Sequence, residues 1–324
     1  MKQKAFEEKH GPQWQQLDTL LITLEQQNSA SNTDNTDFPA LYRTVCHHLA
    51  LAKDRQYSPH LVNRLHHLVL RGHQQLYHQK KPFVSQMARF VMRDFPASLR
   101  REAKLFWLAT VLFLLPAVIM GLLCYSNGDM IYSVHNVMGV ADIEAMYDPA
   151  NEHIGRERQS DTDFMMFGFY IYNNISIGFR TFASGLLYGI GTVVVLISNG
   201  VFIGSVAGHL TQLQFTETFW PFVSGHGAFE LTAIVICGAA GLQLARALYS
   251  PGRLGRIAAL KLAAREAVPL VIGATLMLLI AAFIEAFWSS SSTLSNSIKY
   301  SVAAVLWLAV IAYFLFAGRG HEPR

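Results

Sequence analysis

The chain has little charge for its length. Only 15% of its 324 residues are Asp, Glu, Lys or Arg, whereas 52% are hydrophobic. In average globular chains about 25% of the residues are charged and roughly 45–50% are apolar. This composition excludes an intrinsically disordered chain. The net charge is only +4, which excludes a basic nucleic-acid-binding tail. The excess of apolar residues indicates a membrane protein.

Cysteine is also scarce, and strand patterns are missing. Cys46, Cys124 and Cys237 are too few for a disulfide framework and lack zinc-finger spacing. We expect them to be small hydrophobic residues in packed interiors, with no cofactor. The first 104 residues have no strand-like alternation, and the apolar positions Trp14, Leu17, Leu21 and Leu24 recur at helical spacing. The sequence therefore predicts an all-α fold.

Long uncharged apolar runs begin near residue 105. A helix needs about 20 apolar residues to cross roughly 30 Å of hydrocarbon. We predict six membrane segments, over residues 105–125, 175–197, 201–215, 222–247, 267–287 and 300–316. The segment 201–215 is short, so the sequence leaves open whether it crosses completely. Ser198-Asn199-Gly200 is interpreted as the tight turn of a hairpin between the second and third segments.

The remaining segments are assigned by composition. We predict a cytoplasmic helical domain over 1–81, a basic amphipathic helix at the membrane surface over 82–104, an acidic outer loop over 126–169, and a cytoplasmic tail over 318–324. The first residues are polar and charged, so we expect no cleavable signal peptide.

The basic residues predict the orientation, because Lys and Arg concentrate in cytoplasmic loops. Residues 89–104 and 246–265 each contain five Lys or Arg, whereas residues 126–169 contain eight acidic and two basic residues. Six crossings reconcile this distribution with both termini in the cytoplasm. We therefore predict a membrane protein that contacts the lipid bilayer and does not bind nucleic acid.

Several polar side chains fall inside the predicted segments, where ionisable groups are expensive and often functional. With these boundaries they lie in the outer half of the membrane: Asn173, Asn174, Arg180, His209, His226, Glu230 and Glu285. Three interpretations stay open. An Arg180–Glu230 ion pair with His226 nearby locks the bundle, or the group serves transport or signalling, or it binds metal for catalysis.

The metal interpretation has the weakest support from the sequence. His226 and Glu230 are four residues apart and share a helix face, and His209 is a candidate third ligand. However, the His-Glu-x-x-His pattern of metalloproteases is absent. We therefore expect no catalytic residue and no bound metal, with His226 and Glu230 as the weak candidates.

Glycine is concentrated in residues 175–215. Spacings of four residues occur among Gly185, Gly189, Gly200, Gly204 and Gly208. This small-xxx-small pattern allows helix backbones to approach closely. We expect close packing within the chain, although the same faces could pair two copies in a homo-oligomer.

A set of short motifs resembles the stage II sporulation protein M family. The motifs are Asn173-Asn174-Ile175-x-x-x-Phe179, Phe182-x-x-Gly185, Gly189-x-Gly191-Thr192, Asn199-Gly200, Gly204, His226-Gly227-x-x-Glu230-Leu231 and Gly238-x-x-Gly241. The N-terminal 104 residues resemble the long form found in bacteria that do not sporulate.

The resemblance implies a non-enzymatic inner-membrane scaffold or coupling subunit of a cell-envelope complex. Family members in spore formers work with peptidoglycan hydrolases, and long forms are often encoded beside MoxR-type ATPases. Both kinds of protein are therefore expected partners. Two alternatives remain, namely a channel or transporter using Arg180, His226 and Glu230, and an intramembrane metalloenzyme.

Overall fold

The computed structural model describes residues 2–26, 38–77, 83–150, 162–291 and 294–319. These residues form helices and turns, without a β-strand among them. The chain divides into two compact units, Met1–Met87 and Ala88–Arg324. The all-α membrane fold predicted from the sequence is confirmed.

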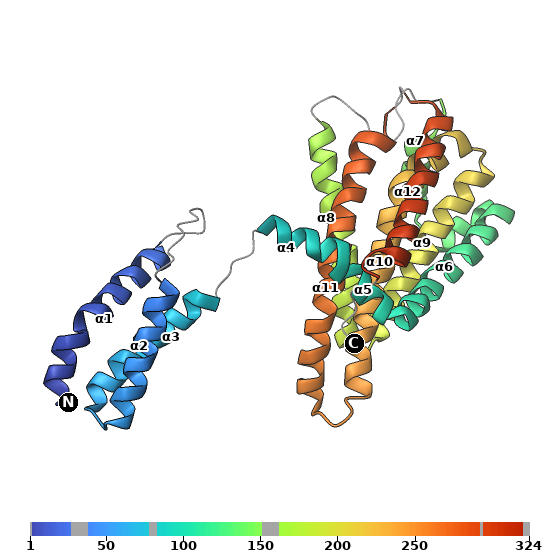
Figure 1. Cartoon of the computed structure of the whole chain (residues 1–324). Helices are drawn as coiled ribbons and strands as arrows, with labels where there is room; N and C mark the ends of the chain where they lie inside the picture. The colour runs from blue at the N-terminus through green and yellow to red at the C-terminus, as the bar shows by residue number, and fades with distance from the viewer. Residues whose placement is uncertain (1, 27–37, 78–82, 151–161, 292–293, 320–324) are drawn as a thin grey trace. The chain divides into compact units, whose positions relative to one another are not determined.

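The N-terminal unit contains three helices with a core of their own. They are α1 (Gln3–Gln26), α2 (Phe38–Asp54) and α3 (Pro59–Tyr77) (Figure 1). The buried core includes Phe6 and Trp14 from α1, Val45 from α2 and Leu65 from α3. Because each helix contributes one apolar face, the three faces close a core without residues from the second unit.

The second unit is a helical bundle. The boundary between the two units falls within α4 (Phe83–Arg89), and the second unit then continues with the short π-helix η1 (Phe90–Asp94) and α5 (Phe95–Arg101). The long helices are α6 (Ala103–Ser126), α8 (Thr162–Ala183), α9 (Ile190–Gln212), α10 (Thr216–Tyr249), α11 (Arg256–Phe283) with the π-helix η4 (Ile284–Ser289), and α12 (Asn296–Phe316). Within the described residues, all of these except α8 are long and apolar enough to cross a membrane.

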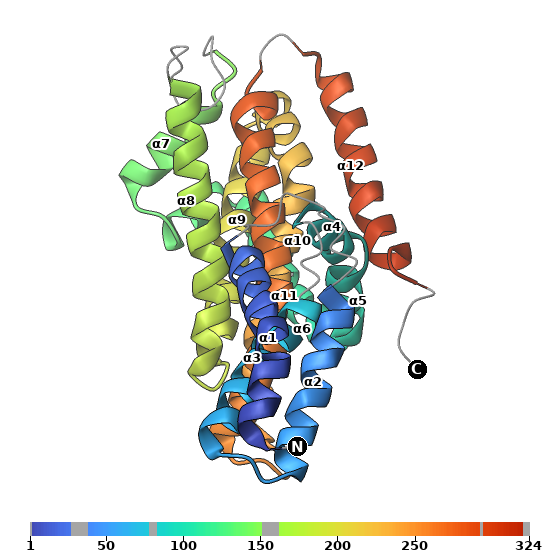
Figure 2. The same ribbon diagram turned by 60° about the vertical axis from the view of Figure 1, so that its left-hand side comes forward.

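Helix α10 lies at the centre of this bundle. It contacts α6, α8, α9, α11 and α12, and 78% of its most apolar stretch is buried, compared with 17% in α6. Helices α8 and α12 lie on opposite flanks of the α10–α11 pair (Figure 2). The outward face of α6 exposes large apolar side chains such as Trp107, Leu115 and Leu122. Such a surface suits contact with lipid.

The predicted membrane segment over 175–197 is wrong. The chain turns at the 3-10 helix η3 (Ser184–Leu186) and at Tyr188 and Gly189, whose φ angles are 52° and 78°. Left-handed backbone ends a helix, and α9 then starts at Ile190. The predicted turn at Ser198–Gly200 is also wrong, because these residues lie inside α9. Hydropathy could not locate the turn because both of its flanks are apolar.

Moving this turn also settles the length of the third segment. Helix α9 has 23 residues, or about 35 Å at 1.5 Å per residue, which is enough to span the hydrocarbon. The number of long helices after the N-terminal domain remains six within the described residues. The beginning of α6 and the end of α12 consequently lie towards the same end of the bundle.

Glycines allow α9 to pack closely against α6. A methyl group built on Gly200, Gly204 or Gly208 would overlap the backbone of Phe113, Ala117 or Gly121, respectively. The two helices run parallel, since residue numbers increase together along the contact. The partner of this glycine face is therefore α6, whereas Gly185 and Gly189 lie in the turn after α8 and pack on α10.

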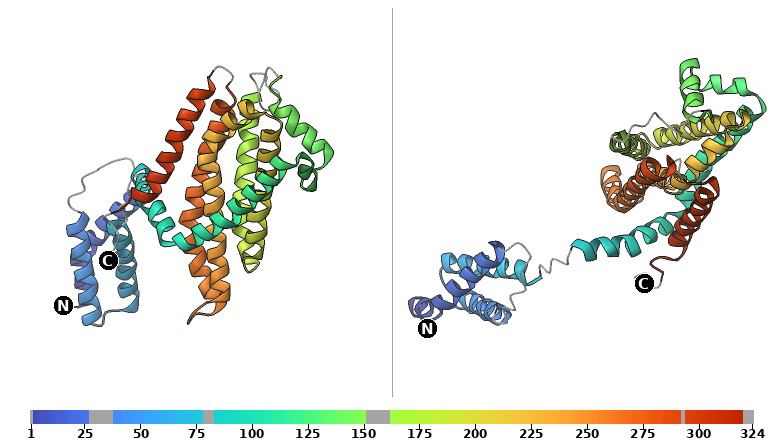
Figure 3. Two further views of the ribbon diagram at one scale, coloured as in Figure 1. Left: turned by 90° about the vertical axis from the view of Figure 1, so that its right-hand side faces the viewer. Right: turned by 90° about the horizontal axis from the view of Figure 1, so that it is seen from above.

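The segment 126–169 is more ordered than the predicted acidic loop. It contains the 3-10 helix η2 (Gly128–Ser133) and α7 (Val137–Tyr147), and α8 already begins at Thr162. Val140, Ile143 and Tyr147 form an apolar face that packs into the bundle. Helix α7 lies at one end of the bundle, which we call the α7 end; the opposite end carries the turn 250–255 (Figure 3). Residues 151–161 of the loop lie outside the described residues.

The amphipathic segment predicted over 82–104 is not one helix. It comprises α4, η1, α5 and the beginning of α6. In α4, Phe83 and Val84 are exposed, whereas Phe95 and Leu99 of α5 are buried in the core beside α11. The position of α4 at a membrane surface stays a prediction.

The α6–α9 contact predicts a selective effect of a single methyl group. Gly204→Ala should lower the free energy of unfolding by about 1–3 kcal/mol, because the methyl group meets backbone that cannot move aside. Thermal unfolding of the detergent-solubilised protein measures the effect. Gly168→Ala is the control, because this α8 position is open. Equal stability of the two variants would contradict the close packing.

Burial of His48 predicts an acid-sensitive N-terminal domain. The Trp14 Nε1–H group donates to His48 Nδ1 at 3.2 Å. Burial, together with the smaller effects of nearby His10 and His47, lowers the pKa of His48 from 6.5 to about 4. The unfolded chain therefore binds the proton more tightly. Stability present above pH 6.5 should be lost progressively as the pH falls towards 4.

Urea unfolding of residues 1–87 as a function of pH measures this loss. His48→Gln should flatten the pH dependence while leaving an acceptor for Trp14. The exposed His67 is the control, and His67→Gln should leave the dependence unchanged. A wild-type curve that is flat between pH 6.5 and 4 would contradict the assignment.

Candidate functional site

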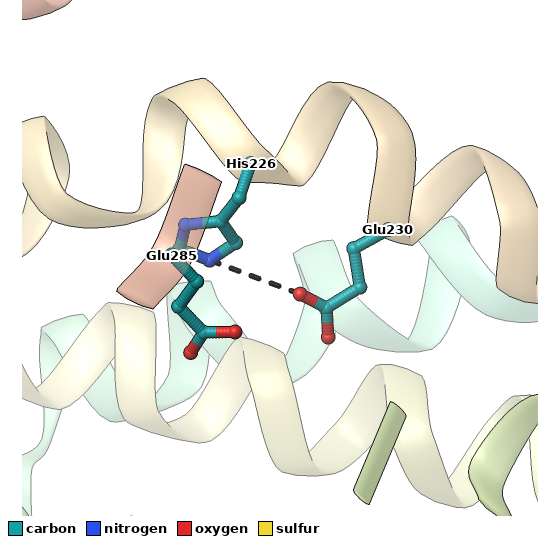
Figure 4. A group of neighbouring side chains, drawn as sticks. All are labelled: His226, Glu230 and Glu285. Carbon is teal, nitrogen blue, oxygen red and sulfur yellow. Dashed lines mark ion pairs between the residues drawn. The ribbon is translucent and has the colours of Figure 1, made fainter. Parts of the chain in front are cut away.

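Three ionisable side chains converge near the α7 end of the bundle. His226 and Glu230 lie one turn apart on α10, and Glu285 reaches them from the π-helix η4 (Figure 4). One potential ligand atom of each lies within 4.8 Å of the others. His226 is buried, and the two carboxylates are partly buried. The grouping of His226, Glu230 and Glu285 was within the set predicted from the sequence.

The geometry on α10 follows from helical periodicity. Residues four apart lie on the same face, and His226 Nε2 is 3.8 Å from Glu230 Oε2. This separation is longer than a hydrogen bond. The imidazole of His226 and the carboxylate of Glu230 therefore lie close together on one face of α10 without a direct hydrogen bond.

Neighbouring polar groups hold two of the three side chains, His226 and Glu285, in place. His226 Nδ1 and Ser289 Oγ are 3.1 Å apart, and Asn174 Nδ2 of α8 donates to Glu285 Oε2 at 3.5 Å. Lys299 Nζ at the beginning of α12 donates to the Ser289 carbonyl oxygen at 2.9 Å. The group thus connects α8, α10, α11 and α12 at one level of the bundle.

Sequence reasoning missed Ser289 and Lys299. Both residues lie between the predicted membrane segments 267–287 and 300–316, yet both are buried. A π-helix adds a residue to the turn and is frequent at functional sites; η4 directs both Glu285 and Ser289 towards α10. The position of Lys299 directly before an apolar run was the sequence signal that could have indicated its burial at the end of a helix.

Two predicted members of the polar group are elsewhere. Arg180 is exposed, one turn before the end of α8, at the end of the bundle opposite α7. Among the described residues it has no ion pair with Glu230, so the predicted Arg180–Glu230 lock is wrong. The moved turn explains this, since it reverses the depth of Arg180. Asn173 is exposed and donates to Asn174 Oδ1 at 3.1 Å.

His209 belongs to a second, separate pair. Its Nε2 atom is 2.7 Å from Glu144 Oε1 of α7. Nearby, His135 Nε2 and Ser205 Oγ are 2.9 Å apart. These contacts attach η2 and α7 to α9, so His209 is not a third ligand beside His226.

Helix α7 closes the bundle above the group. Tyr147 packs edge-on against Phe222, and the Phe222 ring in turn contacts the His226 ring. Burial raises the pKa of the Tyr147 phenol, and the nearby Glu285 and Glu230 carboxylates raise it further. The acidic loop segment therefore contributes an apolar cover.

An apolar groove lies at the opposite end of α10. It has a volume of about 440 Å³ and is lined by residues that include Tyr188, Val193, Leu242 and Arg246. Leu242 follows Glu230 by 12 residues, which corresponds to about 18 Å along the helix. This groove and the polar group are therefore separate features.

Comparison with known proteins identifies the membrane unit. Residues 109–290 match the family described as stage II sporulation protein M. This protein belongs to that family. Residues 4–78 match a domain of unknown function (DUF8413). No curated protein and no solved structure matches the chain.

The matched region of this stage II sporulation protein M family member includes most of the polar group. His226, Glu230, Glu285, Asn174 and Ser289 all lie within 109–290, whereas Lys299 lies beyond it. The second match covers the three-helix domain with its separate core. The family predicted from the sequence motifs is thus confirmed.

The arrangement predicts different roles for two polar residues of α8. Asn174→Ala should lower the free energy of unfolding by about 1–3 kcal/mol, because Glu285 loses a buried partner. Arg180→Gln should change it by less than about 0.5 kcal/mol, as expected for an exposed side chain. Thermal unfolding in detergent compares the two. A larger loss for Arg180→Gln would restore the ion-pair interpretation.

Proposed function

We propose that this membrane protein is a non-enzymatic scaffold or coupling subunit of a cell-envelope complex in the bacterial inner membrane. The observation that carries the proposal is the pairing of two units with separate cores. Residues 6–76 supply the core of the first unit, and the second unit is a bundle with an apolar outer surface. Such a chain can bind one partner beside the membrane and another within or across it.

The distribution of charge supports an orientation with both termini in the cytoplasm. Arg253, Arg256, Lys261 and Arg265 lie at the end of the bundle that carries the turn 250–255. The beginning of α6 and the end of α12 lie towards this same end. Under the positive-inside rule this end would face the cytoplasm, which supports a cytoplasmic N-terminal domain and an outer α7.

A transport function has less support from the geometry. Transporter sites commonly use broken helices around a cavity near the membrane midplane. Helix α10, which carries His226 and Glu230, is continuous from Thr216 to Tyr249. Arg180, the third residue of the proposed pathway, lies apart from them.

The family resemblance supports the choice of partners. Peptidoglycan enzymes are the proposed partners at the outer face, where α7 presents the exposed Val137 and Met138. A MoxR-type ATPase is the proposed partner of the cytoplasmic domain. The two partners would then be coupled through the bundle.

Affinity purification from native membranes tests the proposal. The full chain, solubilised in mild detergent, should retain envelope enzymes and an ATPase at stoichiometric levels by quantitative mass spectrometry. A variant lacking residues 1–87 should lose the ATPase and retain the envelope enzymes, because the bundle has its own core.

The control compares equal amounts of folded protein, as judged by size-exclusion chromatography. Recovery of the full chain alone, or only with copies of itself, would contradict a scaffold. Loss of every partner on removal of residues 1–87 would contradict coupling through two separate surfaces.

A further inference from the structure

The geometry of the polar group on α10 and η4 points to a binding site for a metal ion. We propose that His226 Nε2 and one oxygen each of Glu230 and Glu285 bind a divalent first-row transition-metal ion. This inference is independent of the proposed scaffold function, since a metal can stabilise a scaffold or take part in its regulation.

The spacing of the three donor atoms is close to that of a metal site. Zinc bonds to nitrogen and oxygen are about 2.0–2.2 Å long, so tetrahedral ligands stand about 3.4 Å apart. His226 Nε2 and Glu230 Oε2 are 3.8 Å apart, and all three atoms lie within 4.8 Å. Rotation of the two long Glu side chains would bring the donor atoms closer together.

The contacts behind the donors favour the required state of the histidine. With its proton on Nδ1, His226 donates to Ser289 Oγ, and the Nε2 lone pair then points towards the two carboxylates (Figure 4). A hydrogen bond from the second ring nitrogen is typical of metal-bound histidines. Asn174 binds Glu285 Oε2 and leaves Oε1 for the ion.

Charge balance supplies an independent argument. Two carboxylates held this close in a partly buried site repel each other unless a cation or a shared proton compensates them. Arg180, the cation predicted to pair with Glu230, is remote and exposed. A divalent ion bound to both carboxylates removes the repulsion. A proton shared by Glu230 and Glu285 is the competing solution.

The donor set selects the class of ion. Imidazole nitrogen suits zinc, copper, iron and nickel, whereas magnesium and calcium prefer sites made of oxygen atoms alone. One imidazole and two carboxylates therefore favour an ion such as Zn²⁺ over Mg²⁺ and Ca²⁺. Three protein ligands leave a fourth position for water or a further ligand.

Direct binding to the purified full chain tests the inference. The protein is prepared with a tag that contains no histidine, stripped with a chelator, and titrated with Zn²⁺ against a chromogenic competitor. We expect one tight Zn²⁺ per chain. Replacement by Co²⁺ should give visible absorption bands of a four-coordinate site, a readout that needs no variant.

Near-isosteric variants locate the site. Glu230→Gln and Glu285→Gln should each weaken binding by more than 100-fold, and Ser289→Ala by about 10- to 100-fold, the range typical for partners of metal ligands. The control is Glu144→Gln, which alters the separate His209–Glu144 pair and should leave the tight site intact. Unfolding of the stripped proteins verifies that each variant is folded.

Three outcomes would overturn the inference. They are absence of tight Zn²⁺ and Co²⁺ binding by the wild-type chain, tight binding that persists in Glu285→Gln, and equal affinity for Mg²⁺ or Ca²⁺. The first result would leave the shared proton as the means by which Glu230 and Glu285 are held together.

Discussion

The burial of α10 is the constraint on which the rest of the bundle depends. Five helices contact it, so every polar group on it needs a partner from a neighbour, since lipid supplies none. His226 is within hydrogen-bond distance of Ser289, and the carboxylate of Glu230 lies close to that of Glu285. The small residues along α10 let the neighbours approach closely enough to provide these partners; Gly241, for example, lies against backbone of α8.

The two ends of the bundle are consequently different. Near the α7 end, polar side chains from α8, α10, η4 and α12 form a connected group beneath the aromatic ring of Tyr147. At the opposite end, Arg246 pairs with Glu102 at 2.9 Å, beside an apolar groove. The polar group connects four helices at one end, and in the proposed scaffold the basic residues at the other end would favour the orientation in the membrane.

Part of the candidate site could be predicted from the sequence. The pair His226 and Glu230 follows from a spacing of four residues, and Glu285 is conspicuous as a carboxylate inside an apolar run. His209 pairs with Glu144 of α7 and does not lie beside His226, whereas Arg180 was assigned wrongly for a separate reason. Depth was counted from a turn placed at Ser198–Gly200, although the chain turns at Ser184–Gly189. A residue with left-handed backbone conformation between two apolar runs does not change the hydropathy profile, so the profile could not locate this turn.

The sequence alone determined the class of protein, because apolar length and the scarcity of charge depend only on composition along the chain. It also determined the family and the number of long helices. Only the tertiary structure decided which side chains meet. Ser289 and Lys299 join the polar group through a π-helix and the docking of α12, and His209 leaves it for Glu144 of α7. Such contacts depend on where helices end and how they are rotated, to which average hydropathy is insensitive.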